Sequence, residues 1–245
     1  MRRAWAAYNR RDGLKQISIV LVAAGVYEAA RSLIEPNWAL AIANAERIAE
    51  LERGLSFAWE QSLQRAFLGV PELITAMNLF YFVGHFVLTG IFFLWLYRSS
   101  RDGFRSFRNG FIVATAIAVL IHWWFPTAPP RVVGDLGIMD TLRVFWNLDI
   151  GSPHGSALSN PVAAVPSLHA GWAVGVGIGL WRYAQKPALR MLGAVYPVAV
   201  LLTIVVTGNH FIFDALAGVA VLAAGFLLAE LPRFKRQQKM GYNCA

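Results

Sequence analysis

The chain has 245 residues, of which 57% are hydrophobic and only 15% charged, and its mean hydropathy is +0.49. A soluble domain is about half apolar and about a quarter charged, so this composition excludes an ordinary soluble protein and indicates a membrane protein. A formal net charge of +8 can indicate nucleic-acid binding, but here the basic residues follow a membrane topology, and no nucleic-acid partner is expected.

Six apolar segments are long enough, or nearly so, to cross a bilayer, which takes about 20 helical residues. In chain order they are residues 17–34, 73–97, 111–125, 167–183, 191–206 and 211–228. Glu28 and Arg31 interrupt the first segment, and the short third segment ends in Trp123 and Trp124, which suit the aromatic belt of a membrane. The basic start resembles a signal peptide, but no small-residue cleavage site follows, so we expect a retained first span. The sequence predicts an all-α, polytopic bundle of six transmembrane helices.

Lysine and arginine residues predict the orientation of this bundle. They cluster at residues 2–15, 98–108, 182–190 and 233–239, which all lie on one side of six spans. The positive-inside rule makes that side cytoplasmic. We therefore expect a multi-pass protein of the plasma (cytoplasmic) membrane, with both termini in the cytoplasm and one integral membrane domain over residues 1–245.

Two long connections fall on the outer side. Within residues 35–72, apolar residues recur near helical spacing at Leu40, Ile42, Ala45, Ile48, Leu51 and Leu55. Charged residues stand between them, which predicts an amphipathic helix lying in the membrane interface. Residues 126–165 are rich in Pro, Gly and Ser and predict an irregular loop.

Three polar clusters, at residues 126–131, 166–169 and 208–214, share the outer side of the predicted bundle. His210 and Asp214 are four residues apart, so they lie on one face of a helix. The carboxylate can accept a proton from one imidazole nitrogen and leave the other as a nucleophile. His169, at the start of the fourth span, can protonate a leaving oxygen. The sequence thus predicts a catalytic group of His169, His210 and Asp214.

The same clusters offer ligands for a phosphate group. Arg131, Ser167 and Asn209 are the expected phosphate-binding residues, because guanidinium and small polar side chains hydrogen-bond phosphate oxygens well. Small residues at Gly171, Gly175, Gly179 and Gly218 predict close helix packing near the site.

Other polar residues have plainer interpretations. His85 and His122 are expected to be structural, and His154 to be solvated in its loop. For Arg131 taken alone, the plainer interpretation is that it anchors a loop to lipid headgroups. Asp214 differs, because a carboxylate about one turn inside an apolar helix is costly and points to function. The single cysteine, Cys244, and the spacing of the five histidines predict no metal site.

Together these motifs resemble the type-2 phosphatidic acid phosphatase superfamily. Pro166, Ser167 and His169 match its Pro-Ser-x-His signature, and His210 and Asp214 match the end of its third signature. The resemblance runs from the third span onward. It implies six spans, no metal or cofactor, a phosphohistidine formed on His210, an orienting Asp214, and His169 as the acid for the leaving group.

Some positions depart from that pattern. The first signature has a lysine where this chain has Trp124, and the third has Ser-Arg where it has Thr203 and Ile204. The run from Pro126 to Arg131 and the Gly-Asn-His pattern instead look like the aureobasidin-resistance-type inositol phosphotransferases, typified by inositol phosphorylceramide synthase. That branch moves a phosphoinositol headgroup between lipids.

Three functional hypotheses follow. The first is a membrane phosphotransferase that acts on a phospholipid headgroup at the outer face through a phosphohistidine. The second is a lipid phosphate phosphatase that hydrolyses phosphatidic acid or a prenyl pyrophosphate. The third, from a different class, is a proton-coupled transporter with His and Asp as a relay; it is disfavoured because the ionisable residues gather at one face and no repeat is evident. The expected partners are a phospholipid or prenyl-phosphate substrate and the bilayer.

Overall fold

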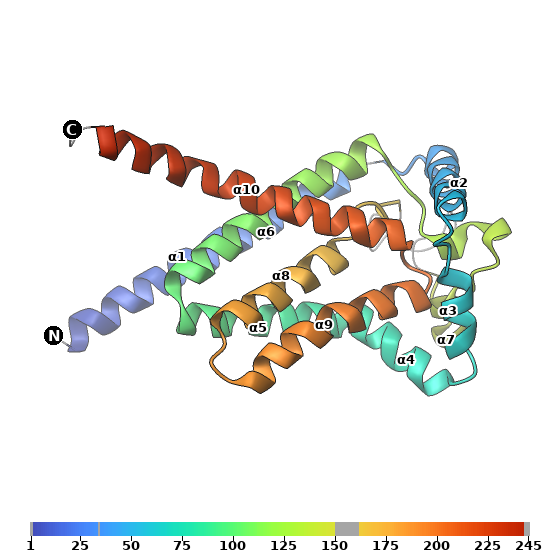
Figure 1. Ribbon diagram of the computed structural model, residues 1–245, viewed down its shortest axis with the longest axis horizontal. Coiled ribbons are helices and arrows are strands. Elements are labelled where there is room, and N and C mark those ends of the chain that lie inside the picture. The colour runs from blue at the N-terminus through green and yellow to red at the C-terminus, as the bar shows by residue number, and fades with distance from the viewer. Residues whose placement is uncertain (1, 34, 150–161, 243–245) are drawn as a thin grey trace. The chain divides into compact units, whose positions relative to one another are not determined.

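The structure, a computed structural model, describes residues 2–33, 35–149 and 162–242. The chain divides into two compact units, Met1–Glu35 and Pro36–Ala245. The first contains helix α1 (Arg2–Ser32), and the second contains all the other helices (Figure 1). Apart from an isolated bridge between Thr127 and Ala163, the regular elements of the described residues are helical, so the predicted all-α class is confirmed.

Among the described residues, five helices are long and apolar enough to cross a membrane. They cover Arg11–Ala30, Pro71–Ser99, Arg101–Trp124, Pro187–Val206 and Ile212–Leu231. The fourth predicted span corresponds to α8 (Leu168–Tyr183), which has 16 residues. At 1.5 Å per residue α8 is about 24 Å long, shorter than the hydrocarbon core of about 30 Å. The multi-pass character is therefore shown, and the sixth crossing stays a prediction.

The limits of the helices differ from those predicted. The second span is a continuous run of α4 (Pro71–Leu79), the π-helix η1 (Phe80–Gly84) and α5 (His85–Ser99). The prediction that the third segment is short was wrong, because α6 covers Arg101–Trp124. The Ser100 side chain accepts a hydrogen bond from the Gly103 main-chain N–H, so the helix begins among charged residues that an apolar window passes over.

The helices of the second unit pack as a bundle around an aromatic core. Helix α10 (Ile212–Tyr242) packs along α6 and α8, and α8 packs along α9 (Pro187–Val206), as Figure 1 shows. The core joins these helices to α5 through buried side chains that include Phe92, Phe107 and Phe111. This packing fixes the ends of α8 and α10, where the predicted catalytic residues lie.

Helices α8 and α10 approach most closely at two glycines. A Cβ atom on Gly218 would lie 2.1 Å from the Ser167 carbonyl oxygen, and one on Gly171 would lie 2.7 Å from the Gly218 carbonyl oxygen. The predicted close approach is therefore confirmed at these positions. Gly175 and Gly179 instead make room for aromatic side chains, including Phe111 and Phe92.

Short helices gather at the end of the bundle where α10 begins (Figure 1). These are α2 (Trp38–Gly54), α3 (Glu60–Phe67), η2 (Pro130–Val132), η3 (Gly134–Leu136) and α7 (Thr141–Trp146). The segment predicted as an irregular loop is thus partly helical, and Asp140 begins α7 by accepting from the Leu142 and Arg143 amides. His154 falls outside the described residues.

Helix α2 turns a different face inward from the one its largest apolar residues indicate. Its buried residues are Ala41, Asn44, Ala45, Ile48, Ala49 and Glu52. Leu40, Leu51 and Leu55 are exposed. The buried face packs on the segment after α6, where the Asn44 side-chain amide donates to the Pro126 carbonyl at 2.9 Å. A place in the membrane interface stays a prediction for the exposed face.

Candidate functional site

His210 stands at the turn between α9 and α10. Gly208 adopts a left-handed conformation there, with φ of +70°, and the His210 amide donates back to the Ile204 carbonyl. The ring Nδ1 lies 3.0 Å from the Ala164 carbonyl oxygen and 3.2 Å from Asp214 Oδ2. Both neighbours are acceptors, so Nδ1 carries the proton and the lone pair of a neutral ring belongs to Nε2.

Asp214 is fully buried in the first turn of α10. Its Oδ2 accepts from the Phe211 amide at 2.9 Å as well as from His210, while Oδ1 has no hydrogen-bond partner among the described residues. A buried carboxylate with an unused acceptor is costly to a fold. The arrangement fixes the imidazole and stabilises it when it becomes positively charged.

His169 lies in the first turn of α8, with its ring centroid 5.8 Å from that of His210. The Tyr81 ring stacks on it at 4.3 Å, and the main chain of Tyr81 hydrogen-bonds to the His169 ring. Tyr81 belongs to the π-helix η1, an irregularity that is frequent at functional sites. His169 Nε2 is buried without a hydrogen-bond partner among the described residues. The structure therefore brings the two predicted histidines together.

Arg131 and Asn209 are joined to each other beside His210. Arg131 Nη1 donates to Asn209 Oδ1 at 2.7 Å, and the Arg131 amide donates to the Gly208 carbonyl at 3.0 Å. The guanidinium Nε also lies 3.4 Å from Asp140 Oδ2, the carboxylate that caps α7. The predicted cation is thus next to the turn that carries His210, with a carboxylate as its ion-pair partner.

Ser167 has a structural task at this site. Its hydroxyl oxygen accepts from the Ala170 amide at 3.4 Å and caps α8, and its own amide donates to the Asp214 carbonyl at 2.9 Å. Ser167 is fully buried. It therefore ties the turn that carries His169 to the helix that carries Asp214, and its contact with phosphate stays a prediction.

Two histidines that the sequence marks as structural also lie here. His122 Nε2 lies 3.3 Å from the Pro166 carbonyl oxygen, which suits a structural role. His85 Nδ1 lies 2.9 Å from the Tyr196 hydroxyl, and its ring centroid is 4.9 Å from that of His169. A single histidine in an apolar segment gives no sign in the sequence that it belongs to this group of rings.

Sequence reasoning missed Glu52 and Glu60 entirely. Both are buried, and their Oε1 atoms accept from the Phe213 amide at 2.7 Å and the Ile212 amide at 2.9 Å. Burial, followed by the hydrogen bond to Glu60, raises the pKa of Glu52 to about 9. One signal was available: Glu52 continues the helical spacing of Ala41, Ala45 and Ile48 along the buried face of α2.

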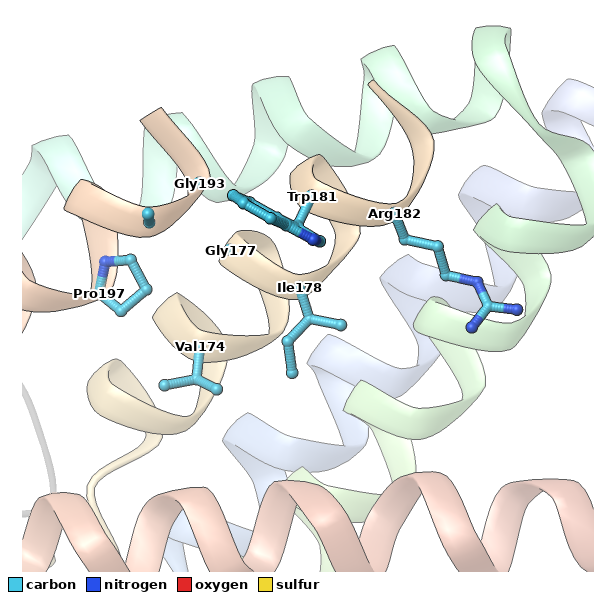
Figure 2. Close-up of a pocket in the computed structure, with 8 residues that line it drawn as sticks. Val174, Gly177, Ile178, Trp181, Arg182, Gly193 and Pro197 are labelled. Carbon is cyan, nitrogen blue, oxygen red and sulfur yellow. The ribbon is translucent and has the colours of Figure 1, made fainter. Parts of the chain in front are cut away.

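A separate hollow lies between α8 and α9. Figure 2 shows it lined by mostly apolar residues, among them Gly177, Trp181 and Pro197, and it encloses about 510 Å³. Gly177 is about 12 Å along the helix axis from His169, at a rise of 1.5 Å per residue. The hollow holds none of the histidines or carboxylates described above. No group of three or more His, Cys, Asp or Glu able to hold a metal occurs within the described ranges.

The model of the PAP2 superfamily matches residues 46–228, which include the second half of α2 and all three polar clusters. The chain belongs to the PAP2 superfamily. This membership supports a phosphatase or phosphotransferase activity on lipid phosphates and gives no support to the transporter alternative. No curated protein and no solved structure matches the chain.

Proposed function

We propose that this PAP2 protein transfers a phosphodiester headgroup, as inositol phosphotransferases do, from a phospholipid to a lipid hydroxyl at the outer face of the membrane. The observation that carries the proposal is the low positive charge beside His210. Arg131 is the cation held against this segment, and it already pairs with Asp140. A guanidinium that is already partly neutralised suits a donor with one negative charge.

A phosphate monoester with up to two charges fits this surrounding less well. Glu52, Glu60 and Asp214 are buried at the start of α10, and their oxygens accept from its first amides, which in other proteins hold phosphate. Arg65 and Arg143 are exposed, so neither side chain folds over the site. The local field therefore favours a monoanionic diester over a dianion.

The first half-reaction uses the ring nitrogens already described. His210 Nε2 attacks phosphorus, and the bond from phosphorus to the glycerol oxygen of the donor breaks. His169 gives that oxygen a proton, so a diacylglycerol leaves. Asp214 stabilises the positive charge on the His210 ring, and the headgroup phosphate is held through a phosphorus–nitrogen bond.

The second half-reaction returns the enzyme to its starting state. The hydroxyl of an acceptor lipid gives its proton to His169 and attacks phosphorus, and the phosphorus–nitrogen bond to His210 breaks. Water in place of the lipid hydroxyl would give hydrolysis by the same route.

The test is a side-by-side assay of the purified protein in detergent. Phosphatidylinositol and phosphatidic acid are supplied in turn, with and without a lipid hydroxyl acceptor, and released headgroup, inorganic phosphate and new lipid product are followed. We expect product from the diester only when acceptor is present. Rapid phosphate release from phosphatidic acid or a prenyl pyrophosphate, with no transfer from any diester, would show a lipid phosphatase instead.

A further inference from the structure

We propose that Glu52 and Glu60 are positioning residues, a carboxyl–carboxylate pair that holds the first turn of α10 and thereby fixes His210 against Asp214. The proposal rests on the proposed function only in taking His210 as the nucleophile. It concerns helices α2 and α3, which contribute none of the residues expected to touch the substrate.

The geometry of the pair is specific. The first amides of a helix lack partners inside the helix. At the start of α10 three successive amides, those of Phe211, Ile212 and Phe213, each donate to a different carboxyl group, from Asp214, Glu60 and Glu52 in turn. One of these contacts is local, and the other two come from residues 152 and 161 positions away in the chain.

The two glutamates are 1% and 4% exposed and hydrogen-bond each other. Two carboxyl groups in contact away from water do not both ionise. Burial first, then the hydrogen bond to Glu60, raises the pKa of Glu52 to about 9, and the charges of Glu60 and Asp214 act in the same direction. At neutral pH Glu52 therefore carries a proton, which it donates to Glu60 while its other oxygen accepts from Phe213.

The glutamate pair is close to His210 along the chain, because the two amides that it binds belong to the residues after His210. Ile212 and Phe213 lie between His210 and Asp214, so a shift of that turn changes the 3.2 Å contact between His210 Nδ1 and Asp214 Oδ2. The other end of the pair is rigid as well. On α3, the Gln64 side-chain amide donates to the carbonyls of Met139 and Val206, which fixes α3 to the end of α9.

The test compares Glu52→Gln with Glu52→Ala. Glutamine can accept from Phe213 and donate to Glu60, as the protonated glutamate does, whereas alanine can do neither. Glu50→Gln, on the exposed face of the same helix, is the matched control. Two quantities are measured in detergent: hydrogen exchange of the amides of residues 211–213, and kcat and KM on whichever lipid the wild type turns over.

We expect Glu52→Gln and Glu50→Gln to keep both quantities within about threefold of wild type. Glu52→Ala should exchange faster and lose kcat, each by about tenfold or more, because the Phe213 amide loses its buried acceptor. KM should change little, since the pair does not touch the substrate. Above pH 9 the wild type should lose kcat as Glu52 ionises beside Glu60 and Asp214, and Glu52→Gln should not.

Two results would contradict the positioning role of Glu52 and Glu60. One is exchange and kcat in Glu52→Ala equal to those of the wild type, and the other is a Glu52→Gln protein as impaired as Glu52→Ala. Failure of the proposed function has a different signature. In that case the wild type transfers no diester headgroup and releases phosphate from phosphatidic acid or a prenyl pyrophosphate, while exchange at residues 211–213 still separates Gln from Ala.

Discussion

At the scale of single residues, the imidazole of His210 is bound on one edge and available on the other. Its Nδ1 faces the Ala164 carbonyl and the Asp214 carboxylate, so the tautomer is fixed before any substrate arrives. Such preorganisation lowers the barrier because the ring is not reoriented during attack. The side chain of Asp214 contributes by holding the His210 ring in this tautomer and orientation.

His210→Ala should abolish turnover, and Asp214→Asn should lower kcat by about 100-fold or more, because an amide no longer fixes the tautomer or stabilises the charged ring. The measurement is kcat at neutral pH on the preferred lipid. Asp135→Asn, at an exposed position, is the control and should act as wild type. A folded His210→Ala protein with near-normal activity would exclude the phosphohistidine route.

The stability of the protein should depend on the proton of Glu52. Its pKa in the folded chain is about 9 against an ordinary 4.5, so its contribution is complete below pH 4.5 and is lost as pH rises toward 9. One proton taken up on folding changes the free energy of unfolding by about 1.4 kcal/mol per pH unit. Thermal unfolding of the wild type and Glu52→Gln should therefore differ in slope over this range. Parallel curves would show that Glu52 is ionised in the folded chain.

These residues also show what local sequence can predict. The four-residue spacing of His210 and Asp214 predicts their contact, and the contact is present. The predicted shared helix face was wrong, because α10 begins at Ile212 and His210 lies in the turn before it. Glu52 and Glu60 reach the same turn from 161 and 152 residues away, and no short pattern records that pairing. Their buried environment arises from tertiary packing, so only the structure shows it.

At the scale of elements, the crossing of α8 and α10 determines how far His169 lies from His210. The crossing has no room for a side chain at Gly218, because the Ser167 carbonyl fills that space. It thus sets the position of the cap of α8 and of the histidine two residues later.

Gly218→Ala should push α8 away from α10. Overpacking of this kind costs about 1–3 kcal/mol of stability, and kcat should fall because the two histidines separate. Gly90→Ala is the matched control, because nothing lies within 4 Å of a Cβ atom there and alanine favours a helix. Unfolding and turnover are measured for both variants. Equal behaviour of the two would show that the crossing tolerates a side chain.

Hydropathy predicts which elements exist better than it predicts their orientation. Five predicted segments coincide with helices able to cross a membrane. Helix α2 buries small and polar residues and leaves Leu40 and Leu51 exposed, so its apolar spacing alone does not indicate which face packs on the protein. In a membrane protein, apolar side chains can face lipid, and small ones permit contact between helices.

At the scale of the whole molecule, the distribution of basic residues predicts that the site faces outward. Asp135→Cys, in a Cys244→Ser background, should react with an impermeant thiol reagent on intact cells, whereas Ser99→Cys should not. Both positions are exposed in the structure. Ser156, in the same outer connection, falls outside the described residues. Labelling at position 99 with protection at 135 would reverse the orientation.

The large sequence separation between the glutamate pair and the amides that it binds also has a consequence for biosynthesis. Ile212 and Phe213 leave the ribosome about 150 residues after the glutamates that they contact. At a synthesis rate of about 5–20 residues per second, those amides are made on the order of ten seconds after Glu52 and Glu60. Until α10 is made, the two side chains lack the amides from which they accept in the folded chain. The candidate site therefore forms last, so a chain truncated before α10 would lack it even if the earlier helices had inserted.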